Sequence, residues 1–261
     1  MGKTIAVAGK GGTGKTLVAA LLTRYLVDGG RGPVLAIDAD PSTNLDFTLG
    51  TSVKQTVGGI REDTSRQVSA GNLMPGISKY EYLELQINQA LVEERGFDLL
   101  AMGRPEGPGC YCAANNMLRL CIDRLSGSYN YVVIDNEAGL EHLSRRTTRN
   151  VNLLLVVSDP TMRGLATAER VALLTHELET HVGHIRLIIN RVPANVRGEL
   201  TLAPQLEQFM RSRQLVLAGL IPSDPLVAEY DTLGRPLVEL PIEAPARRAL
   251  QDVFDSLNGL L

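Results

Sequence analysis

The stretch TIAVAGKGGTGKTLVAALLTRYLV, residues 4–27, decides the fold of this chain. It opens with the apolar run Thr4–Ala8, passes through a glycine-rich turn, and continues as a helical pattern over Thr16–Val27. The turn, GKGGTGKT at residues 9–16, fits the G-x-x-x-x-G-K-[ST] phosphate-loop motif. A strand before the motif and a helix after it are the context that this motif requires. We therefore predict a strand–loop–helix unit that binds phosphate groups.

The residue types in this loop suit MgATP. Glycines let the backbone N–H groups turn inward around the α- and β-phosphates, and the helix N-terminus adds partial positive charge. Lys15 is expected to reach the β- and γ-phosphates, and Thr16 to place its hydroxyl on Mg²⁺. The remaining residues of the predicted nucleotide cradle are Gly11, Gly12, Thr13 and Gly14.

Further short apolar runs alternate with amphipathic helical stretches such as Met162–Glu179. Because the runs are apolar almost throughout, they indicate strands buried on both faces, as in a parallel sheet between helices. We predict one α/β domain over residues 1–261, a doubly wound, mostly parallel sheet with helices on both faces. The polar stretch Thr51–Lys79 is expected to be an insertion with short helices. The runs are Pro33–Ile37, Leu99–Met102, Tyr131–Ile134, Leu153–Val157, Ile185–Ile189 and Leu215–Ile221.

Composition and charge are those of an ordinary globular chain, with 44% hydrophobic and 21% charged residues and a formal net charge of −3. This balance does not indicate a nucleic-acid or membrane partner, and we expect neither. No apolar run reaches the roughly 18 residues that span a bilayer. The first residues run directly into a strand, so we expect no signal peptide and a cytoplasmic location.

One residue distinguishes this loop from the common form of the phosphate-loop motif. Lys10 directly follows the first glycine and gives the deviant form KGGTGKT, residues 10–16. The sequence here resembles the ParA/MinD/nitrogenase-iron-protein class of P-loop ATPases. The resemblance implies that Lys10 crosses a dimer interface to touch the partner's nucleotide. It thus implies a homodimer bridged by ATP, with Lys10 and Lys15 both in the catalytic site.

The same resemblance assigns roles to three carboxylates that follow predicted strands. Asp40 would orient or activate the attacking water, and Asp38 would support the Mg²⁺ shell. Asp135 stands at the Walker B position, where a carboxylate holds Mg²⁺ through water. A carboxylate suits these tasks because it accepts hydrogen bonds from water and attracts a hydrated cation. For Asp38 and Asp40, capping of the following segment is the alternative.

Three residues at the ends of later strands complete the nucleotide site implied by the resemblance. Asn190 would read the adenine edge, since its amide both donates and accepts. Pro222 and Asp224, after the run Leu215–Ile221, resemble the loop that packs on the base.

Two of the three cysteines stand in the glycine- and proline-rich stretch GPGCYC, residues 107–112. Cys110 and Cys112 are poorly placed for a core, and a disulfide between them would close a strained ring. A thiolate pair for a soft or borderline metal fits better, and a two-fold dimer would supply four sulfurs to one ion. Ni²⁺, Zn²⁺ and Cu⁺ all accept such ligands. An unliganded surface pair is the alternative.

Together with this pair, the stretch DNEAGLEHLSRRT at residues 135–147 resembles the CooC family. These are ATPases that assist nickel insertion into carbon monoxide dehydrogenase. The resemblance implies that Cys110 and Cys112 bind nickel, or zinc in the isolated protein, and that the partner is the apo-dehydrogenase. A nickel-containing acetyl-CoA synthase is the alternative client.

Two other functions stay open. The first is an electron donor like the nitrogenase iron protein, but this chain has Asn136 and Glu137 where that family has its second cluster cysteine. The second is a positioning ATPase. Its membrane-binding form uses a basic C-terminal amphipathic helix, whereas Ala246–Leu261 reads as a helix packed on its own domain. His181 and His184 flank a glycine and are expected in a solvated turn.

Overall fold

The computed structural model describes residues 2–72, 76, 79–103, 125–137, 150–177 and 181–261. Within them, eight strands form one sheet in the order β3-β4-β2-β5-β1-β6-β7-β8. All neighbouring strands run parallel except the antiparallel pair β3–β4. The strands are β1 Lys3–Gly9, β2 Val34–Asp38, β3 Val92–Glu94, β4 Phe97–Ala101, β5 Tyr131–Asp135, β6 Asn150–Ser158, β7 His181–Val192 and β8 Leu217–Pro222.

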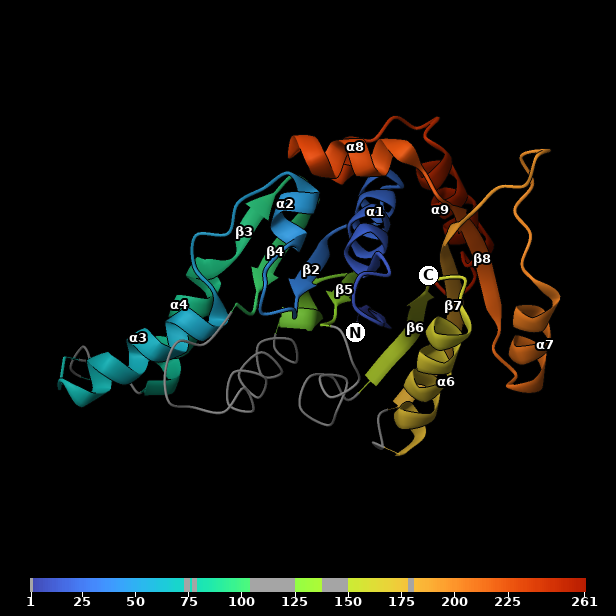
Figure 1. Cartoon of the computed structure of the whole chain (residues 1–261). Helices are drawn as coiled ribbons and strands as arrows, with labels where there is room; N and C mark the ends of the chain where they lie inside the picture. Colours follow the sequence, from blue (N-terminus) through green and yellow to red (C-terminus); the bar gives the residue numbers. More distant parts are fainter. Residues whose placement is uncertain (1, 73–75, 77–78, 104–124, 138–149, 178–180) are drawn as a thin grey trace.

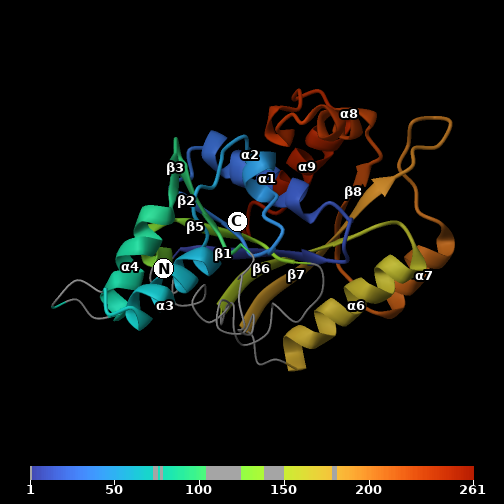
Figure 2. The ribbon, with the colours of Figure 1, turned by 60° about the vertical axis from the view of Figure 1, so that its left-hand side comes forward.

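Helices cover both faces of the sheet, α1, α2, α8 and α9 on one side and α3, α4, α6 and α7 on the other (Figures 1 and 2). This confirms the predicted doubly wound α/β architecture. The helices are α1 Lys15–Asp28, α2 Leu45–Leu49, α3 Val57–Ser69, α4 Lys79–Ala90, α6 Met162–Glu177, α7 Pro204–Ser212, α8 Pro225–Leu233 and α9 Pro245–Ser256, with 3₁₀ turns η1 Ser126–Ser128 and η2 Leu237–Glu239.

Alternate side chains of each central strand enter different layers of the core. In β1, Ile5 and Val7 pack among the side chains of α1 and α9, while Ala6 and Ala8 pack toward α6. Since both faces are buried, the strand has no polar side to show in its sequence. For this reason the sequence of the strand is a continuous apolar run.

The carboxyl ends of the central strands gather the loops that matter for function. Strand order runs outward from β1 in both directions, through β5 and β2 on one side and through β6 and β7 on the other. In an open α/β sheet, ligands bind outside the carboxyl ends of the strands at such a switch point. The glycine-rich loop after β1 lies there.

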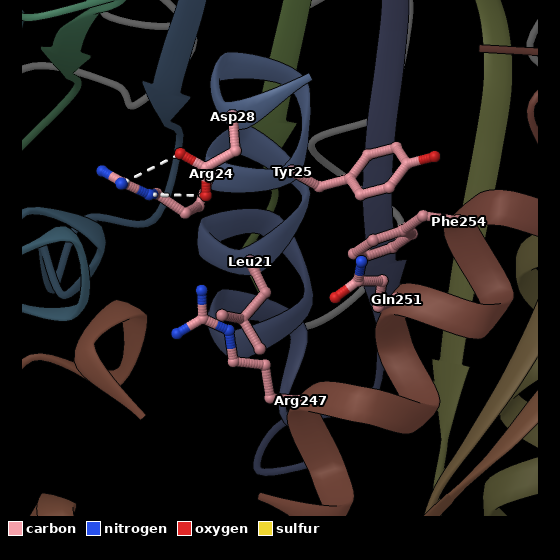
Figure 3. Close-up of a pocket in the computed structure, with 7 residues that line it drawn as sticks. All are labelled: Leu21, Arg24, Tyr25, Asp28, Arg247, Gln251 and Phe254. Atoms are coloured by element: carbon pink, nitrogen blue, oxygen red, sulfur yellow. Dashed lines mark hydrogen bonds and ion pairs between the residues drawn. The ribbon is translucent and has the colours of Figure 1, made fainter. Parts of the chain in front are cut away.

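Helix α9 packs on the domain itself, as the sequence predicted. Leu250 and Phe254 are fully buried in the layer that α1 also lines. Figure 3 shows Phe254 beside Tyr25 of α1. Their ring centroids are 5.3 Å apart, and both side chains line a cavity of about 60 Å³. The Tyr25 hydroxyl also donates a 2.7 Å hydrogen bond to Asp255. The apolar face of α9 is therefore committed to α1 and to β8.

The structure differs from the sequence-based predictions at three places. The hairpin strand β3 was not predicted, because Val92–Glu94 is short and mostly polar. His181 and His184 lie in strand β7 rather than in the expected turn, because β6 extends back to Asn150 and pairs with His181. Finally, within the described part of the stretch Thr51–Lys79, α3 is a helix of 13 residues, longer than the short helices expected there.

Candidate functional site

The phosphate loop joins β1 to α1 in a conformation that only glycine allows at two places. Gly9 and Gly14 have φ angles of 148° and 93°. A Cβ atom on Gly9 would lie 2.1 Å from the carbonyl oxygen of Val157, and one on Gly14 would lie 2.3 Å from the Asn190 amide. The backbone of the loop therefore packs closely against β6 at Gly9 and against β7 at Gly14, and side chains at these positions would displace it.

The inner side of the loop offers groups suited to phosphate. Helix α1 begins at Lys15 with Gly14 as its N-cap, and no side chain caps it. Its first N–H groups are thus free to meet an anion, with the helix dipole behind them. The Lys15 side chain is buried and folds back so that its ammonium donates to the Lys10 carbonyl at 3.4 Å, and the Thr13 hydroxyl donates to the same carbonyl at 2.9 Å.

Two carboxylates face each other at the ends of neighbouring strands. Asp38 ends β2 and Asp135 ends β5, in direct register, and each is only 1% exposed. Burial raises the pKa of Asp135 to about 7, with Asp38 adding to the rise, while a hydrogen bond from Thr16 and the charge of Lys15 lower it. One oxygen of Asp135, Oδ1, is buried without a hydrogen-bond partner among the described residues. An orphaned buried carboxylate beside a threonine hydroxyl fits a hydrated Mg²⁺.

Asp38 has a different set of partners. Its carboxylate accepts three backbone N–H groups, from Asp40 at 3.0 Å and from Asn44 and Leu45 at 2.9 Å each. Burial raises its pKa to about 6 against the lowering effect of these hydrogen bonds. Asp38 thereby holds the turn after β2 and the start of α2. The capping role that the sequence left open for Asp38 is thus present in the structure.

Asp40 lies half-buried in that same turn, and its Oδ1 accepts the N–H of Ser42 at 2.8 Å. Its charge contributes to the raised pKa of Asp135, so the two carboxylates lie close enough to interact. Thr16, Asp38, Asp40 and Asp135 are therefore brought together around the mouth of the loop.

Lys10 lies apart from this group, exposed on the outer side of the loop. Its ammonium is 3.8 Å from Oδ2 of Asp159, which follows β6. Asp159 was not predicted as a site residue, although the stretch Ser-Asp-Pro-Thr at 158–161 directly after an apolar run is a recognisable helix-start signal.

Asn190 is buried against the loop at the end of β7. Its amide nitrogen donates to the carbonyl oxygen of Thr13 at 2.8 Å, and its oxygen accepts the N–H of Arg191 at 2.9 Å. Arg191 takes a φ of 59°, uncommon for a residue other than glycine, where the pairing of β7 with β8 is irregular. Asn190 therefore braces the phosphate loop in this structure, a role the sequence did not indicate.

Pro222 and Asp224 lie beside this region at the end of β8. Asp224 caps helix α8 by accepting the N–H of Leu226 at 3.0 Å, and it also accepts the N–H of Ala246 at 2.9 Å. The signal for this cap was present in the sequence as Asp224 followed by proline at the first helical position. The carboxylate thus ties α8 to α9.

Cys110 and Cys112 lie outside the described residues, as does the part of the stretch 135–147 that follows Glu137. Among the described residues, no group of three or more His, Cys, Asp or Glu side chains is arranged to hold a metal ion. Within the same residues, no helix is both long and apolar enough to cross a bilayer.

The chain is similar to known proteins over most of its length. The CobQ/CobB/MinD/ParA nucleotide binding domain matches residues 4–237. An uncharacterized ATP-binding protein of Methanocaldococcus jannaschii is 43% identical over 253 residues, which is 97% of each chain. The carbon monoxide dehydrogenase accessory protein CooC of Rhodospirillum rubrum is 32% identical over 245 residues, 88% of this chain and 87% of that protein.

Among solved structures, the septum site-determining protein MinD of Pyrococcus horikoshii in complex with Mg-ADP superposes with a TM-score of 0.69 at 23% identity. The match covers 100% of this chain and 97% of that one. The fold is thus that of MinD. With the phosphate loop and the family match over residues 4–237, the chain belongs to the CobQ/CobB/MinD/ParA nucleotide binding domain family and is a P-loop ATPase.

Proposed function

We propose that this ATPase assists nickel insertion into carbon monoxide dehydrogenase or a related nickel enzyme, and that it works as an ATP-bridged homodimer. The observation that carries the proposal is the pair Cys110 and Cys112 in a chain 32% identical to CooC over nearly the whole length of both. Thiolates are ligands for nickel, and nickel is here the cargo rather than a resident cofactor.

In the proposed nucleotide site, the phosphates lie on the uncapped start of α1 and on Lys15. Thr16 and Asp135 would hold Mg²⁺, with Asp38 behind them, and the ion would neutralise charge on the β- and γ-phosphates. The orphaned Oδ1 of Asp135 supports this assignment, because a buried acceptor without a partner otherwise carries a penalty.

Asp40 is the better candidate for the residue that positions the attacking water. Three backbone N–H groups already occupy the carboxylate of Asp38, and its burial leaves little room for an arriving water to reach it. Asp40 is half-buried and takes one backbone N–H at Oδ1. A general base needs to reach a water molecule by hydrogen bond, which favours the more accessible carboxylate.

The proposed dimer brings Lys10 to the partner's nucleotide. The Lys10 side chain is 47% exposed, on the outer side of the loop, and is not needed to cradle its own phosphates, since Lys15 is buried there. A two-fold arrangement would then place two pairs of thiolates on one axis, where Cys110 and Cys112 of each chain bind a single nickel or zinc ion. ATP turnover would drive release of the metal to the apo-enzyme.

A positioning ATPase like MinD is the second candidate, supported by the shared fold. Against its membrane-binding form stands α9, which buries Leu250 and Phe254 against its own domain. An iron-protein-like electron donor is disfavoured by Asn136, which replaces the second cluster cysteine of that family.

The test is nickel-dependent activation of an apo-dehydrogenase by three proteins, the wild type, the Cys110→Ser/Cys112→Ser variant and Lys15→Ala. We expect activation with ATP by the wild type alone. The double serine variant should keep its ATPase, since the cysteines do not belong to the nucleotide site. Full activation by that variant would rule out nickel delivery by this pair, and binding of the wild type to vesicles or DNA with no activation would favour a positioning role.

A further inference from the structure

Asp159 is the acidic neighbour of Lys10 within the same chain. Strands β1 and β6 run parallel with Gly9 opposite Val157, so the residues that follow them, Lys10 and Asp159, emerge side by side. The ammonium of Lys10 lies 3.8 Å from Oδ2 of Asp159. Sheet pairing therefore places a carboxylate next to the lysine that distinguishes this loop.

The Asp159 carboxylate is held in place from its other side. The hydroxyl of Thr161 donates to Oδ1 at 2.5 Å, and the same hydroxyl accepts the N–H of Gly164 at 3.0 Å in the first turn of α6. Gly164 leaves no room for a side chain, because a Cβ atom there would lie 2.1 Å from Oδ1. With Oδ1 fixed in this way, Oδ2 is the oxygen presented to Lys10.

Lys10 is anchored only through its backbone. Its carbonyl accepts hydrogen bonds from Thr13 and Lys15 inside the loop. Its side chain is 47% exposed and that of Asp159 is 28% exposed, so the ion pair is partly solvated. The side chain can leave Asp159 without disturbing the phosphate cradle.

We propose that Asp159 is a positioning residue that holds Lys10 within its own subunit until the partner's nucleotide arrives. The inference rests on the proposed ATP-bridged dimer and adds to it the residue that sets how readily the dimer forms. Exposed ion pairs contribute little because water screens them, whereas a triphosphate offers several negative charges to the same ammonium. Asp159 thus competes with the partner's phosphates for Lys10 and is displaced by them.

The test compares Asp159→Asn in two backgrounds, wild type and Lys10→Ala. Asparagine keeps the shape of the side chain and an oxygen for the Thr161 hydroxyl, so the start of α6 is preserved. We expect Asp159→Asn to tighten dimerisation with a non-hydrolysable ATP analogue by about two- to fivefold, the range of a weak ion pair. In the Lys10→Ala background the chain should stay monomeric whether residue 159 is aspartate or asparagine, and Asp159→Glu should behave like the wild type. A looser dimer for Asp159→Asn, or dimerisation of the Lys10→Ala/Asp159→Asn double variant, overturns the inference.

A second readout separates this inference from the dimer itself. In the nucleotide-free protein, the NMR signal of the Lys10 ammonium should shift when Asp159 is replaced by asparagine. An unchanged signal overturns the inference whether or not ATP drives dimerisation. A shifted signal in a chain that stays monomeric with the ATP analogue would instead overturn the proposed dimer, and with it the release step, while the contact within the subunit stands.

Discussion

Replacing Asp135 with asparagine should stabilise the nucleotide-free protein while impairing its use of Mg²⁺. Asp135 is 1% exposed, and burial raises its pKa from 3.8 to about 7. In the unfolded chain the carboxyl group titrates near its ordinary value of about 3.9. Between about pH 4 and pH 7 the folded state therefore keeps a proton that the unfolded state has already released.

The direction in which stability changes with pH follows from this difference in bound protons. Because the folded state binds more protons than the unfolded state, the free energy of unfolding falls as the pH rises through this window. The contribution is fully favourable below about pH 4 and is lost by about pH 7. A rise in pKa from 3.8 to about 7 corresponds to about 4 kcal/mol. Burial also raises the pKa of Asp38, to about 6, so this residue changes the stability with pH in the same direction.

Asparagine at position 135 carries no charge at any of these pH values. Asp135→Asn should therefore raise the free energy of unfolding by up to about 4 kcal/mol at pH 8 and by less than about 2 kcal/mol at pH 5. For a chain of this size each kcal/mol corresponds to about 2–4 °C in Tm. Urea unfolding of the nucleotide-free protein at the two pH values measures the difference.

The matched control is Asp252→Asn, which makes the same chemical change on the exposed side of α9. It should alter stability little at either pH. Adding MgATP should stabilise the wild type much more than Asp135→Asn, because the bound cation favours the ionised carboxylate. A gain in stability for Asp135→Asn that is equal at pH 5 and pH 8 would refute the argument from a buried charge.

Four further predictions concern the loop and its surroundings. Lys15→Ala should lower ATP turnover by at least about 100-fold, as loss of a preorganised donor does. Asp40→Asn should keep nucleotide binding while slowing hydrolysis by about 10²–10⁴-fold. A phosphate-release assay beside a binding titration checks both variants, and wild-type turnover by either one would show that its residue does not have the proposed role. Lys10→Ala should fold normally, as seen by circular dichroism, and fail to dimerise with ATP in light scattering; a normal ATP-driven dimer would show that the lysine does not cross the interface. Gly164→Ala should lower the free energy of unfolding by about 1–3 kcal/mol through overpacking against Asp159, even though alanine is the better helix former. The control is Gly127→Ala, whose new methyl group has nothing within 4 Å, and it should leave thermal unfolding unchanged.

The sheet and the phosphate loop were predictable from the sequence because each is encoded locally. Every predicted strand run lies in an observed strand or overlaps one, since burial on both faces makes it continuously apolar. Strand β3 was not predictable, because Val92–Glu94 gains its structure only by pairing with β4.

The candidate site likewise contains residues that the sequence predicts and contacts that it does not predict. Lys15 and Thr16 are marked by the motif itself. The bracing of the loop by Asn190 and the ion pair of Lys10 with Asp159 depend on strands far apart in the chain becoming neighbours. Such contacts follow from the order of the strands in the sheet, and the local sequence around these residues does not reveal that order.

The most direct test of the proposed function is the number of nickel ions bound per chain, measured by native mass spectrometry on the ATP-bound protein. We predict one ion per two chains in the wild type and none in the Cys110→Ser/Cys112→Ser variant. Binding should weaken as the pH falls, since only thiolates are ligands and protons compete for them. One ion per chain would contradict a shared site on the two-fold axis, and equal nickel content in the two proteins would contradict binding by this cysteine pair altogether.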